Sequence, residues 1–182
     1  MVCNNLMNNA PLILSIVSII IAICVPSRIA NKQNKIALFE KRYRSYATLL
    51  LVKAYKDIIK ELQLKHDLRN CRLPVIEHFE SNFRYQSDTS NQNDCMKKAI
   101  SALRESEYYA NMLPLLLLSK KERKKCEEMI GKIYEPFFTF ITCMIKCNPE
   151  EWEITEKALN EFINGTETFF DCYEDYIEEK LV

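Results

Sequence analysis

Hydrophobic residues recur at intervals of three and four along most of this chain, which is the spacing of one face of an α-helix. The clearest stripe follows Ser119, and with Glu122 three positions later this serine has the spacing of a capping box. The pattern predicts a helix from about residue 120 to 147, kinked at Pro136. Its apolar positions are Cys126, Ile130, Ile133, Phe137, Phe140, Met144 and Cys147.

A second long stripe lies nearer the N-terminus, at Ile36, Phe39, Tyr43, Tyr46, Leu50, Ala54, Ile58 and Leu62. Strict sevens would place Lys53 and Asp57 on it, so the stripe drifts with a period of 3.6 residues. This drift disfavours a long two-stranded coiled coil and favours packing into a compact bundle. The apolar run at residues 49–52 covers most of the helix circumference, which suggests that the helix passes through the middle of a core.

Three further segments complete the predicted fold. After Pro74, residues 75–83 suggest a short helix, and residues 86–94 read as a polar loop. A helix at 94–112, carrying Ile100, Leu103, Tyr108 and Met112, should be interrupted by Pro114. Asn148, followed by Pro149 and two acids, predicts a helix that runs until Gly165, and a last amphipathic helix follows. The chain is therefore expected to be all-α, with about five helices around one core.

The first 27 residues contain no charged side chain, and residues 10–25 are densely apolar. As a helix, residues 6–25 would be about 30 Å long, the thickness of a bilayer's hydrocarbon core. The basic n-region and small-residue cleavage site of a secretory signal are both missing. A soluble core helix is the alternative, but it would need a stripe that is apolar all round to be covered. We expect a transmembrane anchor formed by Ile13, Ile16, Val17, Ile19, Ile20, Ile21, Ile23 and Val25.

Basic residues follow this segment closely, at Arg28, Lys32, Lys35, Lys41, Arg42 and Arg44. By the positive-inside rule, the N-terminus lies outside the cell membrane and the C-terminal domain is cytoplasmic. The same side chains are expected to contact anionic lipid headgroups. The predicted organisation is an N-terminal segment with the anchor, residues 1–27, and a cytoplasmic helical domain, residues 28–182.

Composition and charge support this picture. The chain has only two glycines, which argues for long helices rather than strands and tight hairpins. The net charge is zero, yet residues 28–72 carry +8 (twelve basic, four acidic) and residues 150–182 carry −9 (two basic, eleven acidic). We therefore expect the acidic last helix to lie against the basic first helix, since opposite charges help to select neighbouring helices.

Candidate chemistry is sparse. The eight cysteines are expected to be reduced and mostly buried, because the chain is neither short nor loop-rich. His66 and His78 have no acid–base partners in the sequence pattern, and Cys143 and Cys147 lack the second ligand pair of a structural zinc site. Phosphate-binding and hydrolase motifs are missing. We expect no catalytic residues, no metal and no cofactor.

The sequence KKERKK at residues 120–125 is the densest basic run. It lacks the stacking aromatics or recognisable module of a nucleic-acid site, so nucleic acid is not an expected partner. A solvated helix face is the simpler interpretation. A contact with anionic lipid or with an acidic protein surface stays open.

The segment NKIALFEKRYRSYATLLL, residues 34–51, resembles a juxtamembrane segment in a loose group of functionally uncharacterised bacterial membrane-anchored helical proteins. The likeness covers residues 36–46 and implies no catalytic residues. It implies a bacterial protein with a single membrane span.

Two functions remain in view. The first is a single-pass membrane protein whose helical domain binds an unknown protein partner as a scaffold, sensor or regulatory subunit. The alternative is a membrane-disturbing or exclusion factor of a mobile element or antiviral system, acting through its anchor. An enzyme would require acids or thiols converging in a deep polar pocket. Self-association into a homo-oligomer is left open by the sequence.

Overall fold

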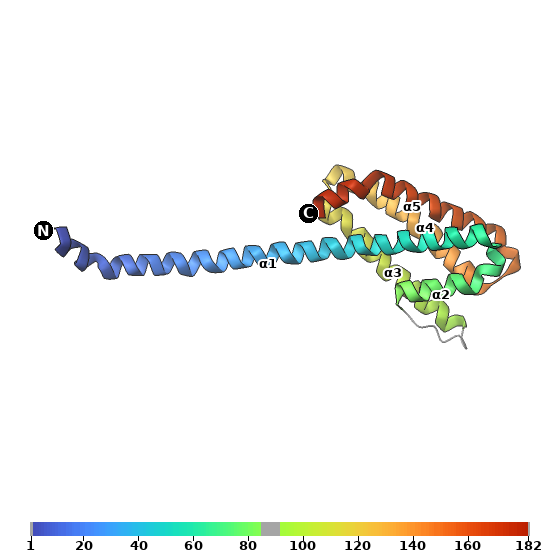
Figure 1. Ribbon diagram of the computed structural model, residues 1–182, viewed down its shortest axis with the longest axis horizontal. Helices are drawn as coiled ribbons and strands as arrows, with labels where there is room; N and C mark the ends of the chain where they lie inside the picture. The colour runs from blue at the N-terminus through green and yellow to red at the C-terminus, as the bar shows by residue number, and fades with distance from the viewer. Residues whose placement is uncertain (1, 85–91, 182) are drawn as a thin grey trace. The chain divides into compact units, whose positions relative to one another are not determined.

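The computed structural model describes the backbone of residues 2–84 and 92–181, and side chains at Ala22 and from Cys24 onward within those ranges. All regular structure in these residues is helical, which confirms the predicted all-α class and the number of about five helices. The helices are α1 (Val2–Lys65), α2 (Arg72–Phe83), α3 (Gln92–Leu117), α4 (Lys120–Lys146) and α5 (Trp152–Leu181). Two 3₁₀ turns, η1 (Leu68–Cys71) and η2 (Pro149–Glu151), precede α2 and α5 (Figure 1).

Contacts divide the chain into two units, Met1–Glu40 and Lys41–Val182. The first unit contributes the N-terminal part of α1, and its described side chains are exposed. The second unit is a helical bundle that contains the rest of α1 and all the other helices. The domain boundary that we predict after Ser27 stays a prediction.

The bundle is centred on α4, which packs against α3, α5 and α2. The stripe predicted for this helix is buried from Cys126 to Met144, whereas Cys147 ends the helix exposed and in a left-handed conformation, with φ of 53°. Pro136 is buried within the helix, and α4 continues through it. One core results, and among the described side chains α4 contributes more buried ones than any other helix.

An aromatic cluster forms the centre of this core. The ring of Phe137 on α4 stacks on Phe162 of α5, with 4.3 Å between centroids, and lies 5.4 Å from Tyr55 of α1. Tyr55 also meets Phe79 of α2 edge-to-face at 5.6 Å, and its hydroxyl donates to the Val75 carbonyl at 3.0 Å. Because the hydroxyl has this partner, the tyrosine can be fully buried without leaving a polar atom unsatisfied.

The buried face of α1 differs from the predicted stripe. Leu49, Val52 and Ile59 are completely buried, whereas Leu50 is 37% exposed and Ala54 is exposed. The bundle therefore covers a different face of this helix from the one that the predicted stripe marks. Leu51 is also exposed, so α1 lies at the edge of the bundle and not in the middle of its core.

The predicted charge pairing between the first and last helices is present in the bundle. Lys53 of α1 lies 2.6 Å from Glu174 of α5, and Lys60 of α1 lies 2.8 Å from Glu167 of α5. Tyr46 of α1 donates to Glu178 of α5 at 2.9 Å. Opposite charges thus line the contact between these two helices, which run side by side in Figure 1.

Three predicted helix boundaries are wrong, whereas α1 runs without a break from Val2 to Lys65. Pro74 lies in the first turn of α2, where proline is tolerated, and therefore does not break the helix. Pro114 is buried inside α3, and α5 continues through Gly165 to Leu181. In α3 the predicted position Leu103 is buried, whereas Tyr108 is 62% exposed. The buried face of this helix consists of Cys95, Ala99, Leu103, Ser106, Ala110, Leu113 and Pro114.

The predicted helix starts are mostly correct. Asn148 accepts from the Glu150 amide at 3.2 Å and caps the turn before α5. Ser119 precedes α4, but its hydroxyl donates to the Glu122 carboxylate at 2.8 Å instead of accepting from a backbone amide. The helix α3 begins at Gln92, two residues before the predicted start, so the last three residues of the predicted polar loop at 86–94 are helical; residues 86–91 lie outside the described residues.

Candidate functional site

The side chains of the predicted membrane anchor, apart from Val25, lie outside the described residues. The backbone there is the N-terminal part of α1, and Val25 is 47% exposed. Within the described part of the chain, the search for an apolar helical segment of bilayer-spanning length finds none.

The six predicted lipid-contact residues have two kinds of surroundings. Arg28, Lys32, Lys35 and Lys41 are exposed along α1. Arg42 instead donates from Nε to the Leu116 carbonyl at 3.2 Å, where it satisfies an oxygen in the last turn of α3. The guanidinium of Arg44 lies 3.9 Å from the centroid of the Tyr109 ring, a cation–π arrangement. These two arginines therefore hold α1 against α3.

The basic run at the start of α4 is solvent-exposed at Lys120, Lys121, Lys124 and Lys125. It lies near α1 and α5, because both helices donate hydrogen bonds to the last residues of α3, just before the run. Arg42 of α1 donates to the Leu116 carbonyl, and the Tyr176 hydroxyl of α5 donates to the Leu117 carbonyl at 3.4 Å. Lys124 has an acidic neighbour at Glu128, 3.9 Å away and one turn along the helix. Four exposed ammonium groups thus mark one end of the bundle.

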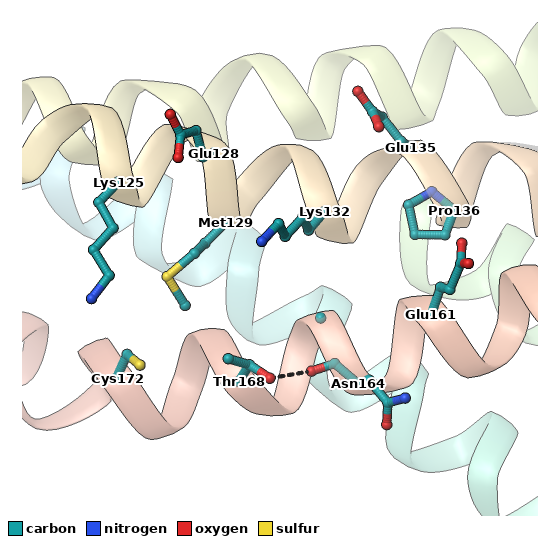
Figure 2. A pocket seen from close by; sticks show the side chains of 11 residues that line it. Lys125, Glu128, Met129, Lys132, Glu135, Pro136, Glu161, Asn164, Thr168 and Cys172 are labelled. Carbon is teal, nitrogen blue, oxygen red and sulfur yellow. Dashed lines mark hydrogen bonds between the residues drawn. The ribbon is translucent and has the colours of Figure 1, made fainter.

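A groove with a volume of about 690 Å³ runs between α4 and α5 (Figure 2). From α4, Lys125 and Met129 point toward α5, where Cys172 and Thr168 lie opposite. Its acids include Glu128 and Glu161, each of which pairs with a lysine one turn away, at 3.9 Å in both cases. Charges of both signs alternate around the groove and do not converge on a reacting centre.

Gly165 of α5 is one of the residues that line this groove. A Cβ atom at this position would lie 2.7 Å from the Lys132 carbonyl oxygen, closer than real Cβ atoms approach. Gly165 is therefore a site of close helix packing, and the sequence interpretation of this glycine as a helix end is corrected. The glycine lets the backbones of α4 and α5 meet.

The thiols and imidazoles do not assemble into a site within the described residues. Burial raises the pKa of Cys71 and Cys143, and it raises the pKa of Cys126 to about 12, so these thiols are poor nucleophiles. His66 and His78 are both exposed. Over the described residues, no group of three or more histidine, cysteine or acidic side chains is arranged to hold a metal ion.

Burial also raises the pKa of Tyr46, Tyr134 and Tyr173, and the hydroxyls of the first two have side-chain partners. Tyr134 is fully buried on α4, where its hydroxyl lies 2.6 Å from Ser106 Oγ. Tyr46 has a raised pKa because of burial and of its hydrogen bond to the Glu178 carboxylate. Both phenols are therefore held protonated as structural hydrogen-bonding groups.

The exposed apolar residues of α1 are candidates for a binding surface, and the sequence interpretation did not identify them as such. Among the largest exposed hydrophobic side chains are Ile29, Ile36, Phe39 and Tyr43, with exposed fractions from 49% to 57%. The sequence interpretation assigned the last three to the bundle core. Their spacing was the correct signal, but spacing alone does not tell which face of a helix the rest of the fold covers.

Comparison of the chain with models of protein families, with curated proteins and with solved structures finds no match in any of the three. The resemblance of residues 36–46 to bacterial juxtamembrane segments therefore stays a prediction.

Proposed function

We propose that this chain is a single-pass membrane protein whose cytoplasmic helical bundle binds another protein, without catalytic activity of its own. The supporting observation is that α1 is a single helix from Val2 to Lys65, and that its residues before Arg28 carry no charge. A helix satisfies its own backbone hydrogen bonds, which is what the interior of a bilayer requires. The basic side chains from Arg28 to Lys41 support the cytoplasmic placement of the bundle.

The bundle itself supports a binding role. Burial raises the pKa of Cys126 and of Tyr134 in its core, and its groove between α4 and α5 carries paired, alternating charges. Such an arrangement suits recognition of a partner surface better than proton transfer, which needs an acid or base directed at a reacting atom. The exposed lysines at the start of α4 offer a positively charged surface for an acidic partner or for lipid headgroups.

Membrane fractionation tests the anchor. The full chain is expected to stay in the membrane fraction after alkaline carbonate washing, and Ile16→Arg with Ile20→Arg should release it, because each arginine at a helix centre costs about 2.5–3.5 kcal/mol. The matched control places the same charges at Asn34 and Ala37, on exposed positions of α1, and should stay in the membrane. Recovery of the unaltered chain in the soluble fraction without detergent would refute the anchor.

Cysteine labelling tests the orientation. Two variants are compared, one that keeps Cys3 as the reactive thiol and one that keeps Cys172. In each variant the other of these two cysteines is replaced by serine, as are the exposed Cys24 and Cys147. A membrane-impermeant maleimide should label Cys3 in intact cells and Cys172 only after lysis. The reverse result would place the bundle outside. Loss of membrane potential on expression of the full chain, absent in the double arginine variant, would favour the alternative membrane-disturbing function.

A further inference from the structure

One helix of this protein carries two apolar faces, and the bundle covers only one of them. In the bundle, Leu49 and Val52 of α1 are completely buried, whereas Leu50 is 37% exposed and Tyr43 is 57% exposed. At about 100° per residue, Val52 lies roughly 160° around the helix from Leu50. The second apolar face of α1 therefore points away from the core.

This second face extends along α1 at alternating intervals of four and three residues. We call it the outer stripe, and it consists of Val25, Ile29, Ile36, Phe39, Tyr43 and Leu50, with exposed fractions from 37% to 57%. Two positions at these intervals do not belong to the outer stripe. Lys32 is exposed but charged, and Tyr46 is buried in the bundle. A row of half-exposed isoleucine and aromatic side chains on one helix face is a typical protein-binding surface.

The spacing is that of a coiled-coil heptad. Ile29, Ile36 and Tyr43 occupy one core position, a, and Val25, Lys32 and Phe39 occupy the other, d. In parallel coiled coils, β-branched residues at a are those found in two-stranded pairs, where leucine is usual at d, and this chain has isoleucine at two of its a positions. From residue 53 onward the same sevens place Lys53 and Asp57 in the seam, so the heptad ends near Leu50.

The flanking charges indicate what the second strand is. Lys35 occupies position g and Glu40 occupies position e of the following heptad. In a parallel pair of identical helices, Lys35 of each copy faces Glu40 of the other copy, which gives two attractive contacts. An antiparallel pair would instead bring together the g positions Arg28, Lys35 and Arg42, which are all basic. The helix is thus complementary in charge to a second copy of itself in parallel register.

We propose that two copies of this chain associate in parallel through the outer stripe, forming a short two-stranded coiled coil over residues 25–43. The proposal names a partner for the proposed membrane-anchored protein, and rests on that function only in that a shared membrane would impose the parallel orientation. The seam is short and contains Lys32, whose charge lowers its stability, so the anchor assists by raising the local concentration of the two helices.

Site-directed crosslinking of the full chain tests the pairing. Cys3, Cys24, Cys147 and Cys172 are first replaced by serine, so that the remaining cysteines are buried. Ile36→Cys, at position a, should give about ten times more dimer with a short bismaleimide than Asn34→Cys, at position f on the far side of the coil. Both positions are exposed in the single chain, so neither substitution alters the core of the bundle. Equal crosslinking at the two positions would overturn the proposal.

Charge reversal distinguishes a second copy from a lipid surface. Lys35→Glu and Glu40→Lys should each weaken self-association of the purified chain in detergent by about tenfold, because two attractive pairs become repulsive. The double variant should restore association. A lipid-bound stripe predicts the opposite for Glu40→Lys, which would bind vesicles containing anionic lipid more tightly and leave self-association unchanged. That result, or a double variant that stays monomeric, would overturn the proposal.

The dimer and the anchor can fail separately. Crosslinking of Ile36→Cys in a chain that fractionates as a soluble protein would retain the dimer and reject the anchor. A membrane-bound chain that does not crosslink would retain the anchor and reject the dimer. Ile36→Asp is the complementary variant: it should abolish the dimer while the thermal unfolding of the bundle is unchanged, since Ile36 lies outside the buried core.

Discussion

Gly165 of α5 lies so close to Lys132 of α4 that a Cβ atom at position 165 would be 2.7 Å from the Lys132 carbonyl oxygen. The neighbour is backbone, so it cannot rotate away as a flexible side chain would. This close contact between the two helices that line the groove therefore depends on the missing side chain of one residue.

Replacing this glycine should destabilise the bundle. We expect Gly165→Ala to lower the free energy of unfolding by about 1–3 kcal/mol, the usual range for overpacking, as measured by urea denaturation. Gly131 on α4 is the matched control, because a Cβ there meets nothing within 4 Å. Gly131→Ala should be neutral or should stabilise by up to about 1 kcal/mol, since alanine favours a helix. Equal effects at the two positions would contradict the close packing.

The buried hydrogen bond between Ser106 and Tyr134, at 2.6 Å, should stabilise the contact of α3 with α4. Tyr134→Phe and Ser106→Ala each leave one buried hydroxyl without its partner, which should cost about 1–3 kcal/mol. The double variant should cost less than the sum of the two, because no hydroxyl is then left unpaired. Ser101→Ala, an exposed position of α3, is the control for loss of a serine hydroxyl. Simple additivity in thermal or urea unfolding would argue against the pair.

The ion pairs of Glu167 predict a pH dependence of stability. The hydrogen bond from Lys60, followed by the charge of Lys56, lowers the pKa of the Glu167 carboxyl below its usual value. A carboxyl whose pKa is lower in the folded state stabilises the fold above its unfolded pKa of about 4.3, and this contribution is lost as the pH falls through the folded value. Glu167→Gln should therefore be less stable than the natural chain at neutral pH, with a difference that shrinks below pH of about 4.

The control for this pH dependence is Glu156→Gln, an exposed position on the same helix. Its stability should follow that of the natural chain across the same range. Because Glu167 is partly exposed, the effect should also weaken in high salt. A difference between Glu167→Gln and the natural chain that grows on acidification would contradict the assignment.

Thiol labelling should separate the cysteines by burial. In the folded bundle, a maleimide should react with exposed Cys147 and Cys172 and leave Cys126 unlabelled. Burial raises the pKa of Cys126 to about 12, so raising the pH from about 7 to 9 should speed the exposed thiols without exposing this one as a thiolate. Labelling of Cys126 should appear only in urea, together with loss of helical circular dichroism. Mass spectrometry of peptides identifies each site, and rapid native labelling of Cys126 would contradict the packing of α4.

The helix α4 shows how far periodicity alone can be used. Its apolar residues occupy one face, and its other positions are largely charged, so only one orientation buries the stripe. Ile130, Ile133 and Phe137 were therefore assigned correctly to the core. The helix α1 is different, because residues 49–52 are apolar all round and two faces compete for burial. Local pattern does not decide between them.

The basic residues of α1 also show what local sequence can and cannot predict. Arg42 and Arg44 belong by sequence to the basic segment, yet the first bonds Leu116 and the second stacks on Tyr109. Their use in packing depends on residues more than sixty positions away, which no local signal reveals. Arg28, Lys32 and Lys35 are exposed along α1, and their contact with lipid headgroups stays a prediction.

By itself, the sequence determined what depends on neighbouring residues: helices throughout, a cap before the turn into α5 at Asn148, and oppositely charged first and last helices that lie together. The tertiary structure decided which face of α1 enters the core and that Gly165 joins two helices instead of ending one. Helix propensity and capping act within one or two turns, so they can be predicted from the local sequence. Burial and close approach depend on which distant surfaces meet, and that is settled only when the helices pack.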